Sequence, residues 1–282
     1  MIADIPEAVV QDIVARALAE DVGPGDITTA ATVDADAQCR AEIVAKADGV
    51  IAGLGVAGTV FRAVDPGISF DEVVADGARV SEGTVVARLE GATRSVLTAE
   101  RVALNFLQRM SGIATLTAEY VEAISGTKAR ILDTRKTAPG LRLLDKYAVR
   151  AGGGSNHRIG LFDGVLIKDN HLRAAGGVGE AVRRARAAAQ HLVKIEVEVQ
   201  TLEEVEEAIQ AGADVILLDN MGVDEVAAAV RIVAGRCEIE VSGGVDMSTV
   251  RALAECGVDY ISVGKLTHSA PALDLSLEVA DD

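Results

Sequence analysis

The sequence predicts an α/β protein in which a parallel (β/α) barrel follows a smaller N-terminal α+β domain. From about residue 128, short apolar strands alternate with helical segments, which is the pattern of parallel strands covered on both faces. The first third of the chain instead mixes helices with short β-rich stretches. A length of 282 residues suits a barrel with a small companion domain.

The first third begins with a predicted helix over residues 6–19, where apolar residues share one stripe. The turn-rich segment DVGPGDITT ends it. The stretches AEIVAKA, FDEVVA and TVVARLE are β-rich with Gly between them and indicate an antiparallel or mixed sheet. Residues 98–124 return to a helical pattern, in which Ser111 and Gly112 predict a break.

The rest of the chain carries the alternation. Its apolar strands are RILDT, GVLIKDN, KIEVEV, VILLDN, IEVSGG and YISVGK, and helical segments between them cover residues 179–191, 202–211, 223–234 and 249–256. Six such strands suggest a barrel with room for a seventh or eighth, and a doubly wound sheet is the structural alternative. We expect a boundary near residue 110, with the α+β domain at 1–110 and the barrel at 111–282.

Composition argues against several classes of protein. The net charge of −16 and an aromatic content of 2% without Trp disfavour a nucleic-acid partner, which needs basic and aromatic surface. The three cysteines form no C-x-x-C pair and no even set, which disfavours a disulfide framework or a zinc site. The N-terminus is acidic and no apolar run is long enough for a membrane span, so we expect a soluble, cytoplasmic protein.

Polar and charged residues end the predicted strands, where a barrel has its active site. They occupy positions 133–137, 168–171, 198, 219–220, 242–244 and 264–265. Residues 128–158 contain eight Lys or Arg and two Asp, a local charge of +6 that predicts an anionic ligand. Arg142, Lys146 and Arg150, spaced four apart, fit a solvated helix face instead. Arg135 and Lys136 do not, because they close a strand.

Two acids, Glu198 and Asp219, end neighbouring strands and are expected to point into the same opening. Beside a polyanion, such a pair predicts Mg²⁺ binding; the alternative is that one of them pairs with Lys168 or Lys136. The segment Ser242-Gly243-Gly244 and the residue Gly264 follow the last two strands, where barrels commonly bind phosphate.

The histidines carry less information. His157 adjoins Arg158 in the segment AGGGSNHR, which favours ligand binding over a structural role. His171 and His268 stay open, and His191 is expected on the surface.

The motifs taken together resemble the quinolinate phosphoribosyltransferase family. They cover nearly the whole chain: EDVGPGDITT, TAERVALNFLQRMSGIAT, DTRKTAPGLR, GGGSNHRIGLFDGVLIKDNH, VEVQ, VILLDNM and SGGV. The most specific feature is D-T-R-K-T in register with N-H-R and I-K-D-N-H. The resemblance implies a seven-stranded barrel and a dimer, or a higher oligomer, with shared active sites, in which the N-terminal domain meets the partner's barrel. It also implies that the tail after residue 270 can return to the N-terminal domain.

The same resemblance implies an activity and its residues: transfer of phosphoribose from phosphoribosyl pyrophosphate (PRPP) to quinolinate with decarboxylation, a step of NAD biosynthesis that needs Mg²⁺. The dicarboxylate would be bound by Arg135, His157, Arg158 and Lys168, with Arg101 from the neighbouring subunit. PRPP and its metal would be served by Lys136, Glu198 and Asp219, with Ser242, Gly243, Gly244, Gly264 and His268 around the phosphates.

Three rival hypotheses remain at this point. A paralogue of the same fold could transfer phosphoribose to another acid or serve metal transport. Lys168 could instead be the Schiff-base lysine of an aldolase. A phosphosugar sensor without catalysis is the non-enzyme alternative, although it has little use for two metal-binding acids beside Lys136.

Overall fold

A computed structural model describes residues 5–280, and their contacts divide the chain into two units. Within the described residues, the first unit contains residues 5–118, 137–153 and 266–280, and the second contains residues 119–136 and 154–265. Each unit is thus assembled from separated stretches of sequence. None of the helices described is long and apolar enough to cross a membrane.

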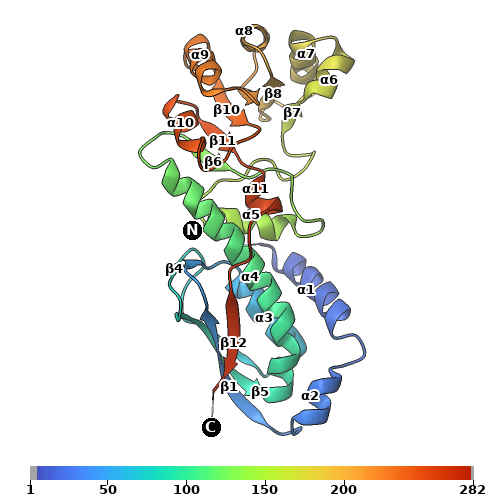
Figure 1. The fold of residues 1–282 in the computed structure, drawn as a ribbon. Helices are drawn as coiled ribbons and strands as arrows, with labels where there is room; N and C mark the ends of the chain where they lie inside the picture. The colour runs from blue at the N-terminus through green and yellow to red at the C-terminus, as the bar shows by residue number, and fades with distance from the viewer. Residues whose placement is uncertain (1–4, 281–282) are drawn as a thin grey trace. The chain divides into compact units, whose positions relative to one another are not determined.

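The first unit is built on an antiparallel sheet of order β12-β1-β5-β3, with a separate β2-β4 pair (Figure 1). Its strands are β1 (Gln38–Ala45), β2 (Gly49–Val50), β3 (Ser69–Glu72), β4 (Arg79–Val80), β5 (Val85–Ala92) and β12 (Leu275–Val279). Its helices are α1 (Glu7–Asp21), α2 (Ile27–Thr32), α3 (Leu54–Val64), α5 (Arg142–Ala151), most of α4 (Thr93–Ala123) and nearly all of α11 (Lys265–His268). The predicted mixed architecture of this region is confirmed as an antiparallel α+β arrangement. Strand β12 extends the sheet beside β1.

The predicted break at Ser111 and Gly112 is wrong, because α4 runs unbroken through both residues. Both serve packing within the first unit. The Ser111 hydroxyl accepts a hydrogen bond from the backbone N–H of Ala52 at 3.0 Å. A Cβ on Gly112 would lie 2.0 Å from the carbonyl oxygen of Pro271, so the glycine permits close contact with the C-terminal segment.

One further expectation fails in the first unit, and one helix was missed. Lys146 is only 1% exposed, so the spacing of Arg142, Lys146 and Arg150 does not mark a solvated helix face. Helix α3 was not predicted, because its segment LGVAGTVFRAV is mostly apolar, with six of its eleven residues buried and Arg62 as the one charged residue.

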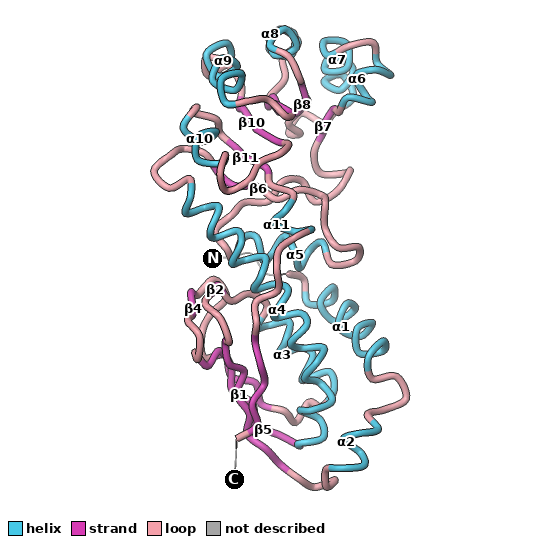
Figure 2. Tube along the Cα trace, in the orientation of Figure 1, coloured by secondary structure: helices cyan, strands magenta, loops and turns pink. Residues whose placement is uncertain are grey.

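The second unit is a parallel sheet of six strands in the order β6-β11-β10-β9-β8-β7 (Figure 2). The strands are β6 (Arg130–Leu132), β7 (Val165–Ile167), β8 (Ile195–Val199), β9 (Val215–Asp219), β10 (Glu238–Ser242) and β11 (Tyr260–Ser262), so all six predicted strands are confirmed. The helices that follow them are α6 (Asp169–Ala175), α7 (Val178–Ala188), α8 (Leu202–Ala211), α9 (Val223–Val233) and α10 (Val250–Glu255). Ser155 forms a single parallel bridge with Leu132 on the outer side of β6.

The strands of the parallel sheet present two different faces. In β8 the apolar Ile195, Val197 and Val199 are buried, and α7 and α8 contact this strand. The alternate residues Glu196 and Glu198 point to the opposite face, since successive side chains of a strand alternate. The face turned away from the helices is therefore rich in polar groups, and it lines the cavity described below.

Candidate functional site

A cavity of about 510 Å³ lies at the carboxyl ends of the parallel strands. All six strands, or the residues directly after them, contribute to its wall. The predicted site residues on the wall are Arg135, Lys136, His157, Arg158, Lys168, Glu198, Asp219, Ser242, Gly243 and Gly244. The sheet thus brings together residues that are up to 109 positions apart, from 135 to 244.

The cationic side of the cavity comes from three segments: Arg135 and Lys136 after β6, Arg158 before β7, and Lys168 directly after β7. Burial and then the nearby Arg135 lower the pKa of Arg158, while Glu196 and Asp163 oppose that shift. Two guanidinium groups that affect each other in this way form a ready receptor for a bound anion.

The fully buried Asp133 holds the segment that carries His157 and Arg158. Its carboxylate accepts hydrogen bonds from the His157 backbone N–H at 2.9 Å and from the side-chain amide of Asn156. The Arg158 guanidinium donates to the carbonyl of Gly164 at 3.0 Å. Asp133 therefore connects the D-T-R-K-T motif to the N-H-R motif within the second unit.

The two predicted metal-binding acids line the same cavity. Glu198 lies 3.4 Å from the Lys168 ammonium, so the alternative that one acid pairs with Lys168 describes a real contact of this site. Asp219 accepts a hydrogen bond from the side-chain amide of Asn220 at 2.9 Å. Neither contact uses all the lone pairs of a carboxylate, which leaves oxygens that can bind a cation.

Gly243 is required where the strand ends of β9 and β10 meet. Its φ is +88°, and a Cβ at this position would lie 2.3 Å from the Asn220 side chain. Asn220 itself has a positive φ of 57° and donates its backbone N–H to the carbonyl of Ser242. Strained backbone of this kind gathers at binding sites, and it accounts here for the S-G-G segment.

Glu196 and Glu240 are buried in this unit and were not predicted as site residues. They are 7% and 2% exposed, and both lie close to the His157 ring. Burial and then repulsion by Glu196 raise the pKa of Glu240 to about 8, against the opposing effect of His157. The signal was present in the segments KIEVEV and EIEVS, where an acid recurs at every second position of a buried strand.

Three predicted site residues are absent from the wall of this cavity. Gly264 belongs to the second unit and follows β11, while Arg101 on α4 and His268 on α11 belong to the first unit. The side chain of Arg101 is 58% exposed and lies 3.7 Å from Glu100. Of the remaining histidines, His171 accepts a hydrogen bond from the Lys168 backbone N–H at 2.9 Å, and His191 is exposed as expected.

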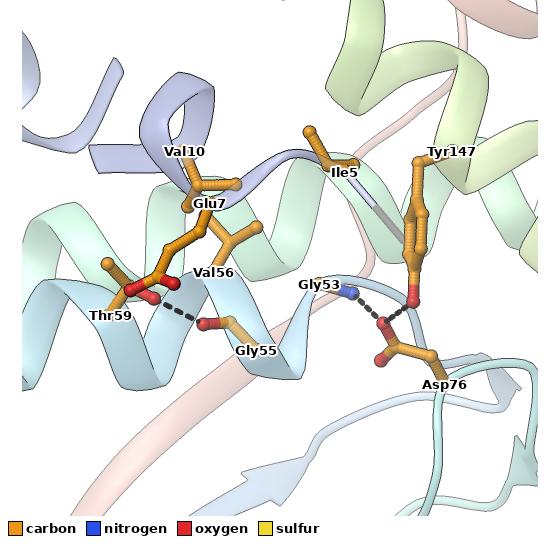
Figure 3. A pocket seen from close by; sticks show the side chains of 9 residues that line it. All are labelled: Ile5, Glu7, Val10, Gly53, Gly55, Val56, Thr59, Asp76 and Tyr147. Carbon is orange, nitrogen blue, oxygen red and sulfur yellow. Dashed lines mark hydrogen bonds between the residues drawn. The ribbon is translucent and has the colours of Figure 1, made fainter. Parts of the chain in front are cut away.

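The first unit has a smaller cavity of about 210 Å³, lined mainly by apolar residues and by Asp76 and Tyr147 (Figure 3). The Asp76 carboxylate accepts hydrogen bonds from the Gly53 N–H at 2.9 Å and from the Tyr147 hydroxyl at 2.7 Å. It also accepts the N–H of Leu54, the first residue of α3. Asp76 thus completes the start of a helix, which is a structural role.

Comparison with known proteins identifies the family. The model described as "Quinolinate phosphoribosyl transferase, N-terminal domain" matches residues 26–111, and the corresponding C-terminal domain model matches residues 113–278. The chain is 46% identical to the "Probable nicotinate-nucleotide pyrophosphorylase [carboxylating]" of Bacillus subtilis, over 92% of this chain and 90% of the relative. It is 44% identical to a mitochondrial quinolinate phosphoribosyltransferase [decarboxylating] of Nicotiana glauca, over 95% and 82%.

A solved structure gives the same result. The nicotinate-nucleotide pyrophosphorylase of Francisella tularensis is similar with a TM-score of 0.93 and 42% identity, and the match covers 99% of each chain. The motifs, the fold and the cavity at the strand ends agree with these matches, and this chain belongs to the quinolinate phosphoribosyltransferase family.

Proposed function

We propose that the cavity at the strand ends transfers phosphoribose from PRPP to quinolinate, with release of pyrophosphate and carbon dioxide, to give nicotinate mononucleotide. One observation carries this proposal: a single cavity combines four cationic residues, a glycine-rich strand end and the acids Glu198 and Asp219, with the buried Glu240 also on its wall. Each group suits one part of the two anionic substrates. The cations attract carboxylates, the acids suit a metal on pyrophosphate, and the glycines admit a phosphate close to backbone.

The dicarboxylate is assigned to Arg135, Arg158 and Lys168, with His157 beside them. Burial and then the nearby Arg135 lower the pKa of Arg158, which supports this assignment because a bound anion offsets the repulsion between the two guanidinium groups. Lys168 also contacts Glu198, so it connects the residues assigned to the dicarboxylate with those assigned to PRPP. Arg101 completes the set from the partner subunit.

PRPP is assigned to the acid side of the cavity, with Lys136, Glu198 and Asp219 near its pyrophosphate. Ser242, Gly243, Gly244, Gly264 and His268 are assigned to its phosphates. The donor set fits Mg²⁺, which proteins hold by one or two carboxylates together with substrate phosphates. When bound, Mg²⁺ neutralises negative charge on the departing pyrophosphate.

The residues of the chain mainly align two anions that repel each other. The pyridine nitrogen then attacks C1 of the ribose as pyrophosphate leaves through an oxocarbenium-like state, and Lys136 offsets part of the leaving charge. The new bond makes the ring nitrogen cationic. That charge stabilises the carbanion left when the adjacent carboxylate departs as carbon dioxide, and a proton then takes its place.

The direct test mixes the protein with Mg²⁺, quinolinate and PRPP and measures carbon dioxide and nicotinate mononucleotide. Release of both in equal amounts is expected. A product only with another acid would favour a paralogue of the same fold. Borohydride trapping on Lys168 with a carbonyl substrate would favour an aldolase, and PRPP binding without turnover would favour a sensor.

Activity is expected to depend on Mg²⁺ through Glu198 and Asp219. Asp219→Ala should raise the Mg²⁺ concentration needed for half-maximal rate more than it weakens quinolinate binding, because the carboxylate serves the metal. The half-exposed Asp169 on α6 is a control acid, and no such change is expected for Asp169→Ala. Unchanged metal dependence in Asp219→Ala, or full activity without divalent metal, contradicts the assignment.

A homodimer with shared sites is proposed for the assembly. Ile159, Leu161 and Phe162 form an exposed apolar loop beside Arg158, and Phe162 is 83% exposed. Asp163 holds this loop by accepting the N–H groups of Ile159 and Gly160. Ordered apolar side chains in water favour coverage by a second copy.

Subunit mixing tests whether Arg101 serves the partner's site. Arg101→Ala and Lys136→Ala are each expected to be inactive alone. If Arg101 reaches across, a mixed dimer has one site with both lesions and one with neither, so activity should return to about half per mixed dimer. As a control, the exposed Arg16→Ala variant is mixed with Lys136→Ala in the same way. This mixture shows the activity that remains when subunits exchange only in part. No recovery, once mass spectrometry confirms exchange, means that Arg101 does not act across the interface.

Two architectural features belong to the same proposal. A seven-stranded barrel is inferred from the six-stranded sheet, with Ser155 beside β6 at the seventh position; its single bridge supports this. The domain boundary near residue 110 is supported by the family models, which meet between residues 111 and 113.

A further inference from the structure

Glu196 and Glu240 stand on the inner face of the parallel sheet, on the two strands that flank β9. Burying carboxyl groups in this way costs free energy unless they are well paired. Among the described residues, Glu196 Oε1 and Glu240 Oε1 have no hydrogen-bond partner. Replacing buried polar groups with apolar ones is often neutral or stabilising, so the fold alone does not account for these acids.

Both acids meet at one imidazole. His157 Nε2 lies 3.1 Å from Glu196 Oε2 and 3.6 Å from Glu240 Oε2. On the other side of the ring, Nδ1 accepts the backbone N–H of Arg158 at 2.7 Å. A neutral imidazole with an accepting Nδ1 carries its proton on Nε2, so this N–H points at the two carboxyl groups.

This arrangement also decides against a metal at the cluster. The ligand atoms of His157, Glu196 and Glu240 lie within 4.8 Å of one another, and these residue types can hold a metal ion. However, a protonated Nε2 has no lone pair for a metal, and the Nδ1 lone pair accepts the Arg158 N–H. The two carboxyl groups therefore hold the ring itself.

The ring in turn holds Arg158. Asp133 fixes the backbone of His157, the two glutamates fix its imidazole, and the imidazole fixes the Arg158 N–H. His157, Arg158 and Glu240 all line the cavity at the strand ends. Arg158 thus reaches the cavity from a segment that is fixed at both the backbone and the ring.

We propose that Glu196 and Glu240 are positioning residues for dicarboxylate binding, which hold the His157 ring and through it set the place of Arg158. This inference rests on the proposed function, in which Arg158 receives quinolinate. It gives both buried acids a role that acts through His157 and leaves the PRPP side of the cavity unaffected.

The test measures KM for quinolinate and PRPP, together with kcat, in Glu240→Leu and Glu240→Ala. We expect KM for quinolinate to rise about tenfold, with KM for PRPP unchanged and kcat less affected than KM. Glu240→Gln keeps an oxygen that can accept the Nε2–H and should restore most of the affinity. Glu238→Leu, on the same strand and face but paired with Lys194, is the matched control and should leave both KM values unchanged.

A double-mutant cycle with His157→Ala tests whether Glu240 affects quinolinate binding through the His157 ring. If Glu240 acts through the ring, Glu240→Leu should change KM for quinolinate no further in the His157→Ala background. Equal changes in both backgrounds, equal losses for both substrates, or no change at all overturn the proposal. So does failure of both Glu240→Leu and Glu240→Ala to fold, because the acids then serve the fold. Wild-type protein that does not turn over quinolinate overturns the proposed function instead.

Discussion

Arg135→Ala and Lys168→Ala are each expected to weaken quinolinate binding by about 2 to 5 kcal/mol, the typical cost of removing one partner of a desolvated charge pair. Binding of PRPP should change much less. The reason is the proposed division of labour, in which Arg135 and Arg158, whose charges affect each other, receive the dicarboxylate while Glu198 and Asp219 serve PRPP and its metal. Nicotinate lacks the second carboxylate and should be a poor substrate for the same reason.

Calorimetric titration of each ligand measures this effect. Arg173→Ala is the control, since Arg173 is an exposed α6 residue that lies 3.7 Å from Asp169 and is absent from the cavity wall. Lys168→Ala should also show some change in metal dependence, because it leaves Glu198 without its ammonium neighbour at 3.4 Å. Equal losses of affinity for quinolinate and PRPP in Arg135→Ala would refute this division of labour.

Glu240 is expected to make the stability of the protein fall as the pH rises from about 4.5 to about 8. Burial and repulsion by Glu196 raise the pKa of Glu240 from 4.5 to about 8 in the folded chain. Within this window the unfolded chain releases the proton while the folded chain keeps it, so the free energy of unfolding decreases with pH. One pKa unit corresponds to about 1.4 kcal/mol, so the total effect is several kcal/mol.

Glu240→Gln cannot ionise and should escape this loss. Its melting temperature should therefore exceed that of the wild type by a margin that grows between pH 5 and pH 8. Glu238→Gln, which removes a more exposed acid from the same strand, controls for the change in net charge. A margin that stays constant over this range means that Glu240 is ionised in the folded protein throughout.

The parallel sheet could be predicted because each strand is a local signal. Segments such as VILLD are apolar on both faces, and the polar residues that follow them fall at one edge by the geometry of parallel strands. For this reason, Arg135, Lys168, Glu198 and Asp219 could be brought together without coordinates. Helix α8 was predicted at its observed bounds, because Gly212 ends it in the left-handed conformation.

The features that were missed depend on contacts between distant parts of the chain. Gly112 resembles a helix breaker in sequence, but α4 continues through it, and the closeness of Pro271 explains why the residue is a glycine. The alternating acids of KIEVEV and EIEVS indicate that Glu196 and Glu240 share a face, but only the paired strands place both beside His157. Lys146 likewise fitted a surface stripe but is buried. A local sequence pattern predicts a helix or strand, but the contacts of its residues with distant parts of the chain determine their roles.

During synthesis, one edge of β1 stays unpaired until the last strand of its sheet has been made. Strand β1 pairs with β5 on one side and with β12 on the other, and β12 (Leu275–Val279) lies 230 positions beyond the end of β1 at Ala45. Until β12 emerges, the nascent sheet presents an open edge of unpaired N–H and C=O groups, which invites pairing with other chains. Arg40 and Glu42 place charge on β1, and we expect these side chains to oppose pairing between nascent copies during that interval.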